Sequence, residues 1–471
     1  MMTRLSHIVF LTCILLRSLV FAQVPGVMTY SEYLGIVQAN HPLAKQANTL
    51  SDVAKREIQA ARGGFDPALK SSYSDKTFDG KEYWKIWESS LIIPVWPGMD
   101  LKAGFDQTTG SYLDPEDVTP TAGLTYLGLS VPLGQGLLID SRRAILLQAK
   151  QTQRMAEAER VKQINKVLLL ATKDYWDWSF TFQRKKLHEE SLRLASVRFE
   201  AIRDRVLLGE QAGIDSLEAF IEVQNRQNIL SQSVLEEANA RLIASNHLWS
   251  PDGEAVILGE PVSPMSGLEE DLVLMNFQLG PLLDSARSTH PEILKYDAKI
   301  QQLGIEKRWA AEKLRPKLNL DYNFLSNQNN ALRFNDYSPW LNNNYKLGLN
   351  FSLPLFLREE RGKLGIMRLK ITQTELEQQQ VSREIVNQVR TSFNELNALA
   401  GQISVQQQLQ LNADKLLEGE LYRFSEGESF LFLVNTRENN VINSRIKLAE
   451  LRTKFAKSTA NVYWSAGQMP R

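Results

Sequence analysis

The chain has 471 residues, of which 43% are hydrophobic and 23% are charged, and its 54 basic residues balance its 54 acidic residues. This composition is that of a folded protein, because a disordered chain is poorer in hydrophobic residues and carries a larger net charge. The zero net charge also argues against a general nucleic-acid binder, which needs excess positive charge to neutralise phosphates. The length suggests two or three domains, or one elongated architecture.

The first 22 residues have the pattern of a secretory signal. Arg4 supplies a positive charge, residues 8–16 form a short apolar core, and residues 20–22 resemble a cleavage site. We therefore expect 1–22 to be a signal peptide and the mature chain to begin at Gln23; a buried N-terminal helix is the alternative. Cys13, the only cysteine, would be removed with the signal, leaving an exported chain without thiols.

The two halves of the chain repeat each other. Three motifs recur at a separation of 249 residues, pairing His41-Pro42 with His290-Pro291, Pro67 with Pro316 and Tyr73 with Tyr322. Gly209-Glu210 recurs as Gly427-Glu428 at a smaller separation, so the first copy carries extra residues between its strands. We expect a first repeat at 23–250, a Pro- and Gly-rich linker at 251–280 and a second repeat at 281–471.

Four segments alternate between apolar and polar residues and are expected to be β-strands. The alternation is strict at 317–326 and 345–354 and weaker at the matching segments 67–76 and 121–132 of the first repeat. Strands of about nine residues are long enough to cross a membrane when tilted. An ordinary soluble sheet with one solvated face would show the same alternation.

A further hairpin is possible in the first repeat. Residues 86–95 and 101–107 resemble strands and flank the turn signal Pro97-Gly98. The sequence leaves open whether this hairpin, at about 86–107, adds strands to the same sheet.

No segment after the signal reaches the roughly 18 uncharged apolar residues that a membrane helix needs. A chain of this kind could enter a membrane only as a closed β-barrel, because an open sheet leaves backbone groups unpaired in lipid.

Long stretches without helix breakers follow each strand pair. We expect helices at 141–206 and 358–423, each about 100 Å long at about 1.5 Å per residue, and return helices at 216–247 and 434–464. Apolar residues recur there in alternating steps of three and four, which predicts helices packed side by side along their length. The seam residues, expected as core packing, are Val161, Ile164, Leu168, Ala171, Tyr175, Trp178 and Phe182, and then Val386, Val389, Phe393, Leu396, Ala400 and Ile403.

The sequence carries no signature of catalysis. It lacks GxGxxG, P-loop, HExxH and GxSxG motifs, and one cysteine with five scattered histidines cannot give zinc-ligand spacing. Carboxylates are dispersed among Lys and Arg on helix faces. His41 and His290 each precede a proline and are expected at helix ends or turns. We therefore expect no enzyme, no cofactor and no metal site.

In this arrangement the chain resembles the TolC-type outer-membrane efflux family, the outer membrane factors. The resemblance rests on the duplicated strand–strand–long helix–turn–helix unit, the repeated His-Pro, the strand ends at 129–133 and 351–355, and the tip segments at 209–219 and 427–436. It implies a mixed fold, a membrane β-barrel with a long α-helical barrel. Family members are homotrimers whose subunits each give four strands to a shared twelve-stranded barrel.

The resemblance also implies a function and a location. Such a chain lies in the outer membrane of a Gram-negative bacterium, with a helical tunnel extending into the periplasm. It is the passive exit duct of a tripartite efflux pump or a type I secretion system, a porin-like transporter. Its partners are a periplasmic adaptor (membrane fusion) protein and an inner-membrane pump or ABC exporter, which supply the energy. The substrate, whether drug, metal ion or polypeptide, is left open.

In that family an acidic Asp-x-x-Asp/Asn motif rings the periplasmic aperture. The matching positions are Asp215 and Glu218 in the first repeat, but Phe432 and Asn435 in the second. Phe432 could narrow the aperture by bulk instead, and the carboxylates could be ordinary helix-start residues favoured by the helix dipole. Further residues implied by the resemblance are acidic Glu426 and Glu428 near the aperture, and Gly209, Glu210, Gly213 and Gly427 in the adaptor-docking tip turns.

Two other classes of protein remain as alternatives. A periplasmic coiled-coil scaffold or adaptor would also carry long helical hairpins, but it would lack paired strands with an apolar face at two places in the chain. An exported enzyme would require a cluster of buried titratable groups in one pocket.

Overall fold

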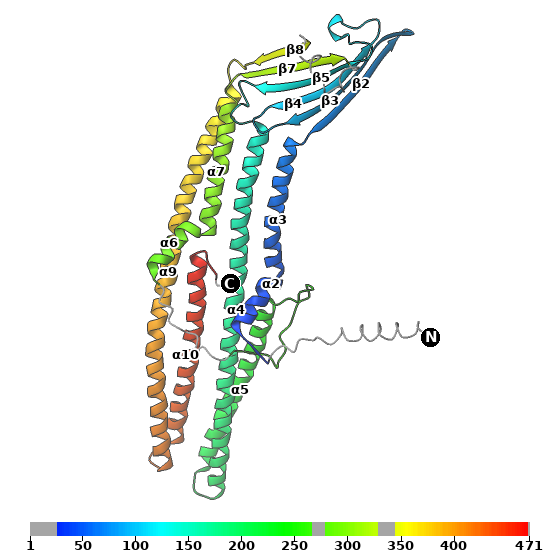
Figure 1. Cartoon of the computed structure of the whole chain (residues 1–471). Coiled ribbons are helices and arrows are strands. Elements are labelled where there is room, and N and C mark those ends of the chain that lie inside the picture. Colours follow the sequence, from blue (N-terminus) through cyan, green and yellow to red (C-terminus); the bar gives the residue numbers. More distant parts are fainter. Residues whose placement is uncertain (1–25, 266–277, 328–343, 470–471) are drawn as a thin grey trace, which may run out of the picture. The chain divides into compact units, whose positions relative to one another are not determined.

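A computed structural model of the chain describes residues 26–265, 278–327 and 344–469 (Figure 1). The expected signal at 1–22 and part of the expected linker lie outside these residues. The described residues form two compact units. The sheet unit comprises Ala47–Val161 and Ser288–Glu384, and the helical unit comprises the other described residues. Each unit draws residues from both halves of the chain.

Two very long helices dominate the secondary structure. Helices α4 (Ser141–Leu207) and α9 (Arg358–Ser425) have 67 and 68 residues, and a rise of about 1.5 Å per residue makes each about 100 Å long. They are followed by return helices α5 (Gly213–Ser245) and α10 (Leu431–Ser465), which begin three residues earlier than expected. Ala212 and Phe430 are the last residues with an extended backbone, and the helical conformation begins directly after each of them.

The described helices include none that is both long and apolar enough to cross a membrane.

Shorter helix pairs precede the strands in each half, and a histidine stands between the members of each pair. The Nδ1 atom of His41 accepts the backbone N–H of Leu43 at 3.1 Å, and that of His290 accepts the N–H of Glu292 at 3.2 Å. The helix-end role expected for both His-Pro motifs is confirmed. The helices are α2 (Tyr30–Asn40), α3 (Pro42–Arg62), α6 (Leu279–Thr289) and α7 (Pro291–Glu312).

The seam of α4 forms the core of the helical unit. Tyr175 and Trp178 are fully buried, and they share one cluster with Tyr33 of α2. The Tyr175 hydroxyl donates to the carbonyl oxygen of Met28 at 2.9 Å, and burial raises its pKa to about 12. These aromatic residues therefore serve core packing, as the seven-residue periodicity predicted.

The sheet unit contains a six-stranded sheet in which every neighbouring pair of strands is antiparallel. Its order is β2-β3-β4-β5-β7-β8, so the hairpin whose place the sequence left open, β3–β4, lies inside this sheet (Figure 1). The first half therefore supplies four strands to this sheet, namely the expected pair β2 and β5 and the two strands of the hairpin. The strands are β2 (Ala68–Phe78), β3 (Lys81–Pro94), β4 (Asp100–Thr109), β5 (Leu124–Pro132), β7 (Lys317–Asn327) and β8 (Tyr345–Ser352).

A short parallel pair, β1 (Val27–Met28) and β6 (Ser263–Pro264), lies in the helical unit.

One face of the large sheet, which we call the apolar face, is lined by hydrophobic side chains from every strand. Directly opposed residues of antiparallel strands lie on the same face. One row that crosses the whole sheet consists of Leu69, Leu91, Ala103, Leu127, Phe324 and Tyr345. The next row runs from β3 to β8 as Ile93, Leu101, Leu129, Tyr322 and Leu347. In the single chain Leu69 and Leu349 are 76% and 62% exposed, so little of the described protein covers this face.

The opposite face of the sheet is mostly polar. Lys102 of β4 reaches over β5 to Asp321 of β7, with 2.8 Å between Nζ and Oδ1. The amide of Asn350 on β8 donates to the other carboxylate oxygen of Asp321 at 3.1 Å. The alternation predicted for β7 and β8 is thus a true separation of faces, with polar contacts on one side and exposed apolar residues on the other.

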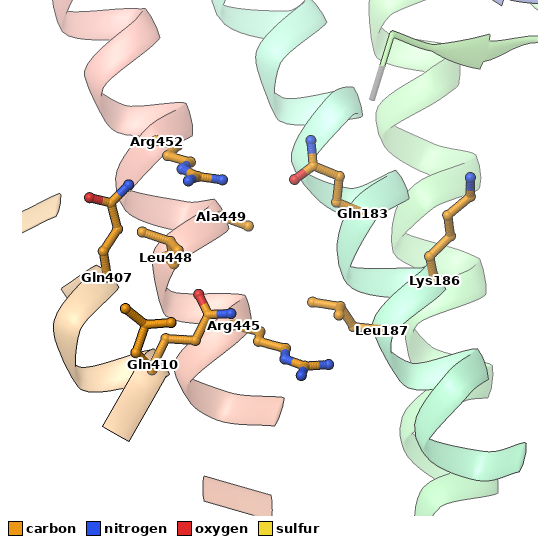
Figure 2. A pocket seen from close by; sticks show the side chains of 10 residues that line it. Gln183, Lys186, Leu187, Gln407, Gln410, Arg445, Leu448, Ala449 and Arg452 are labelled. Atoms are coloured by element: carbon orange, nitrogen blue, oxygen red, sulfur yellow. The ribbon is translucent and has the colours of Figure 1, made fainter. Parts of the chain in front are cut away.

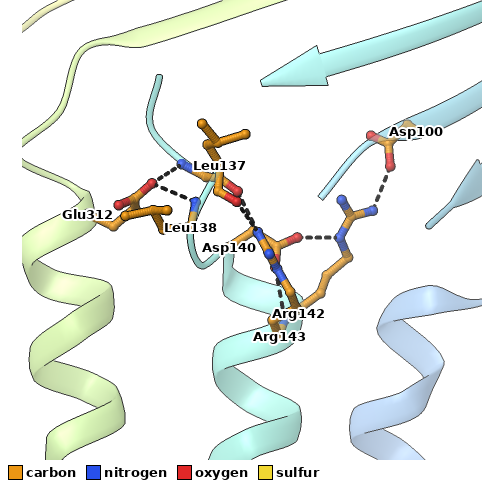
Figure 3. Close-up of polar contacts among 8 residues, drawn as sticks. Asp100, Leu137, Leu138, Asp140, Arg142, Arg143 and Glu312 are labelled. Atoms are coloured by element: carbon orange, nitrogen blue, oxygen red, sulfur yellow. Dashed lines mark hydrogen bonds and ion pairs between the residues drawn. The ribbon is translucent and has the colours of Figure 1, made fainter. Parts of the chain in front are cut away.

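A polar junction joins the sheet to the start of α4 (Figure 3). The Asp140 carboxylate accepts the backbone N–H of Arg143 at 3.0 Å, which caps the helix, and it pairs with both Arg142 and Arg143. Arg142 also binds Asp100 at the start of β4, with 2.7 Å between Nη1 and Oδ1. Burial opposes ionisation of Asp140, but the bonds from Arg143 and Arg142 outweigh it and lower its pKa. The carboxylate is therefore charged at neutral pH and fixes α4 to the sheet.

The same junction holds the chain that leads from β5 into α4. Glu312, at the end of α7, accepts the backbone N–H groups of Gly136 and Leu138 at 3.2 and 3.1 Å. The Arg143 guanidinium donates to the carbonyl oxygen of Gly136 at 2.6 Å. Helices α4 and α7 are thus tied to one short segment below the sheet (Figure 3).

Candidate functional site

The turns of the two long hairpins are built by the same motif. Gly209 and Gly427 have φ of +78° and +76°, a conformation that favours glycine after a helix end. The N–H groups of Glu210 and Glu428 each bond to the carbonyl of the arginine five residues earlier at 2.9 Å, and those of both glycines bond to the residue three earlier. The repeated Gly-Glu of the sequence therefore marks a Schellman turn in both halves.

The residues expected to ring an aperture lie beside these turns in different environments. Asp215 is in the first turn of α5 and Glu218 follows, both half-buried. Phe432 is 66% exposed in the first turn of α10. Asn435 is buried, and its Oδ1 accepts Nη1 of Arg198 at 2.8 Å. Among the four, Asn435 is thus engaged inside the chain, and the aperture role of the set stays a prediction.

The remaining acidic tip residues are exposed. Glu426 and Glu428 both lie on the surface, and the carboxylate of Glu428 lies 4.0 Å from the Nε atom of Arg423. Pairs this exposed contribute little stability. Their charge is therefore available to the solvent at the end of the hairpin.

Large apolar side chains are also exposed at the tips. Beneath them a small core of Ile202, Ala219 and Leu431 packs the turn regions of the two hairpins together. Exposed apolar residues gathered at one place mark a contact surface for another molecule. We call the following set the tip patch: Leu207, Leu208, Ile214, Leu217, Phe430 and Phe432.

A buried ion cluster above the tips links the hairpins to each other. Glu438 of α10 accepts Nη1 of Arg198 on α4 at 2.9 Å and Nη2 of Arg226 on α5 at 2.7 Å. Arg226 is 3% exposed and also pairs with Glu222 at 2.8 Å. One carboxylate therefore pairs with two arginines from the neighbouring hairpin, and Glu222 supplies a second negative charge to Arg226.

Sequence reasoning did not identify this cluster, although a signal was present. Arg226 lies seven residues from both Ala219 and Ser233, which are buried positions of α5, and Glu438 lies seven residues after buried Leu431 of α10. A charged residue at a seam position needs a partner from another helix. The sequence alone could not say which helix provides it.

A groove of about 620 Å³ runs between α4, α9 and α10 in the helical unit (Figure 2). Its charged lining residues are all basic, namely Lys186, Arg445 and Arg452, and several others are glutamines. Arg445 pairs with Asp414 at 2.9 Å. The groove therefore presents mainly basic and amide groups, beside a few apolar residues.

Two of the histidines, His41 and His247, lie near each other. His247 lies 2.6 Å from Asp174 and its ring is 5.8 Å from that of His41, whose pKa is lowered by burial and by His247. Across the described ranges no three His, Cys, Asp or Glu side chains are grouped as a metal would require.

The second half of the chain matches a known family by sequence. Residues 282–468 match the family described as outer membrane efflux protein. The Salmonella enteritidis outer membrane protein TolC is 24% identical over 168 residues, an alignment that covers 33% of this chain and 32% of TolC. The matched part thus spans about a third of that relative's length.

Solved structures match almost the whole chain by fold. The Campylobacter jejuni CmeC outer membrane channel has a TM-score of 0.60 at 13% identity and covers 93% of this chain and 85% of its own. Vibrio cholerae VceC has a TM-score of 0.62 at 14% identity, and the match covers 93% of this chain and 96% of VceC. The open state of the Neisseria gonorrhoeae MtrE outer membrane channel has a TM-score of 0.62 at 12% identity, and the match covers 93% of this chain and 88% of MtrE. The predicted resemblance to the outer-membrane efflux family, a family of transport ducts, is confirmed.

Replacing Glu438 tests the buried ion cluster. Glu438→Gln keeps the size of the side chain but leaves two arginines without their shared counter-charge, and breaking a buried pair in this way costs about 3–5 kcal/mol. We expect thermal unfolding of the helices, followed by circular dichroism, to occur at a clearly lower temperature. The control Glu428→Gln removes an exposed charge and should change stability by less than about 0.5 kcal/mol. Equal unfolding temperatures for both variants would contradict the cluster's role.

Proposed function

We propose that this chain, on the basis of its resemblance to the outer-membrane efflux family, is a channel-tunnel of the outer membrane through which substrates leave the periplasm or a pump for the cell exterior. The observation that carries the proposal is the apolar face. Six strands present rows of hydrophobic residues, several of them exposed, on one side and polar contacts on the other. Such a sheet suits a position between lipid and a water-filled lumen.

Assembly with identical copies completes this duct. An open sheet cannot remain in lipid, because the N–H and C=O groups along its edges would be unpaired. We propose that the chain forms a homotrimer in which the sheets close into a shared barrel and the long helices into a tunnel that extends into the periplasm. Helices of about 100 Å exceed what one compact unit can bury, so neighbouring copies would cover them.

Transport through such a duct is passive, since the sequence contains no nucleotide-binding signature. Energy and selection would come from partners, a periplasmic adaptor and an inner-membrane pump or ABC exporter, in a tripartite efflux pump or a type I secretion system. The tip patch supports docking of the adaptor. It surrounds the turns at Gly209, Glu210, Gly213 and Gly427 and offers apolar contact area beside exposed carboxylates.

We propose that the aperture lies at the tips and that Asp215 and Glu218 restrict it by charge. Three copies would bring six carboxylates to one constriction, which favours cations. Exposed Phe432 would add steric bulk, whereas Asn435 holds Arg198 within the chain.

Paired arginine substitutions on β8 test the membrane position of the sheet. Leu349→Arg places a charge on the apolar face, at a cost of about 2–4 kcal/mol near the middle of a bilayer. Asn350→Arg lies on the polar face, where the new cation can pair with Asp321. We expect Leu349→Arg to abolish detergent-resistant oligomers in outer-membrane extracts and Asn350→Arg to retain them. Similar oligomer yields for the two would mean that the apolar face does not contact lipid.

Removing the aperture charges tests the gate. Asp215→Ala combined with Glu218→Ala should raise single-channel conductance in planar bilayers or weaken cation selectivity, because the constriction loses its negative charge. The control removes two exposed carboxylates of α9 far along the chain from the tips, Glu377→Ala with Glu384→Ala. If conductance and selectivity stay at the level of the unmodified protein, these two residues do not form the gate.

A further inference from the structure

The hairpin β3–β4 is an internal part of the sheet. β3 pairs with β2 on one side and with β4 on the other, and β4 pairs in turn with β5. These three ladders join β2, β3, β4 and β5 edge to edge, with no strand left out between them. The hairpin therefore cannot be removed from the sheet without also detaching β2.

The turn of this hairpin is fixed to the helices of the sheet unit. Arg142 at the start of α4 binds Asp100, the first residue of β4. Gly98, in the turn, has a φ of +86°, and a Cβ there would lie 2.8 Å from Nη2 of Arg143 and 2.9 Å from the carbonyl oxygen of Gly136. The turn thus packs against the polar junction so closely that only glycine fits.

The hairpin also has the same two faces as the rest of the sheet. Leu91 and Ile93 of β3 and Leu101 of β4 continue the apolar rows without interruption. On the polar face Lys102 of β4 pairs with Asp321 of β7. Both faces of the sheet therefore extend over β3 and β4 in these rows, whereas another row of the apolar face begins with the polar pair Ser71 and Ser89.

Strands β2 and β8 are the two edges, and their directions suit each other. Five successive antiparallel pairings separate them, so β8 runs opposite to β2. All eleven residues of β2 are exposed, and so is β8 apart from one half-buried position. A second copy of this chain can therefore extend the sheet with the same antiparallel ladder, its β2 next to the β8 of the first.

The geometry points to a barrel of eighteen strands in the assembled protein, closed by three identical seams between β8 of one copy and β2 of the next. This inference rests on the proposed trimeric duct and departs from the twelve strands that the family resemblance implies. Barrel diameter grows roughly linearly with strand number, so the barrel would be about 1.5 times as wide as one of twelve strands. Its cross-section would be about twice as large.

Thiol cross-linking can identify the strand that meets β8. Cys13 is the only cysteine of the chain, so a Cys13→Ser background offers no competing thiol. Tyr73→Cys on β2 is combined with one partner on β8, and the purified full chain is treated with a bis-maleimide that spans about 10 Å, enough for diagonal neighbours across two strands. Because the register of the seam is not fixed by one chain, the β8 partners are tested in turn: Tyr345→Cys, Leu347→Cys, Leu349→Cys and Phe351→Cys.

The matched control places the first cysteine on β4 as Ala103→Cys, with the same partners on β8. Within one chain β4 lies three strands from β8, about 14 Å away at about 4.8 Å per strand, and β2 lies five strands from β8, about 24 Å away. Both distances exceed the span of the linker, so links between copies dominate in either case. A trimer whose barrel used only β4, β5, β7 and β8 would bring β4 next to β8.

We expect at least one Tyr73 pair to give covalent dimers and trimers on denaturing gels and the Ala103 pairs to give none. Cross-linked trimers with Ala103 but not with Tyr73 would overturn the eighteen-strand barrel while leaving the proposed duct intact. A trimeric mass in detergent without links from either series would also overturn it. Monomers throughout, by mass and by gel, would contradict both the seam and the proposed duct.

Discussion

The structure depends on one constraint, which links the apolar face of the sheet to its edges. An exposed apolar face requires lipid around it, and in lipid the backbone groups of the edge strands must be paired. The apolar face is stable against lipid, and lipid provides no hydrogen-bond partners for the backbone of β2 and β8. A single chain satisfies the first condition and not the second. The proposed ring of identical copies satisfies both, and the same ring would cover helices that are too long for one compact unit.

Polar contacts give this arrangement its precision where the hydrophobic effect cannot. At the start of α4, Asp140 and Glu312 bind backbone and arginine groups and fix the helix ends beneath the strands. Near the tips, Glu438 holds Arg198 and Arg226 of the other hairpin. Each contact is specific in direction, whereas the apolar seams are not, so these groups set which helix meets which. A cluster this close to the tips also couples the positions of the two hairpins there.

Much of the fold could be predicted from the sequence because its determinants are local. The three–four spacing of apolar residues and the absence of helix breakers define α4 and α9 to within two residues of their ends. Strict alternation defines β7, and the repeated Gly-Glu marks both hairpin turns. The His-Pro motifs were correctly assigned to helix ends for the same reason.

What could not be predicted depends on partners distant in sequence. β3 contains adjacent apolar residues such as Ile92 and Ile93, so its faces become visible only when it is paired with β2 and β4. The burial of Asn435 follows from Arg198, which lies on another helix. The aperture residues were assigned by resemblance, and one chain by itself does not bring three copies of Asp215 together.

The most direct test of the central claim is the mass of the mature protein in solution, measured by light scattering during size-exclusion chromatography with and without detergent. We expect a protein that leaves the membrane fraction only with detergent, behaves as a single trimeric species in detergent, and precipitates when the detergent is removed. A stable monomer of uniform mass in detergent-free buffer would contradict the proposed assembly, because it would mean that the apolar face and both edges are satisfied within one chain.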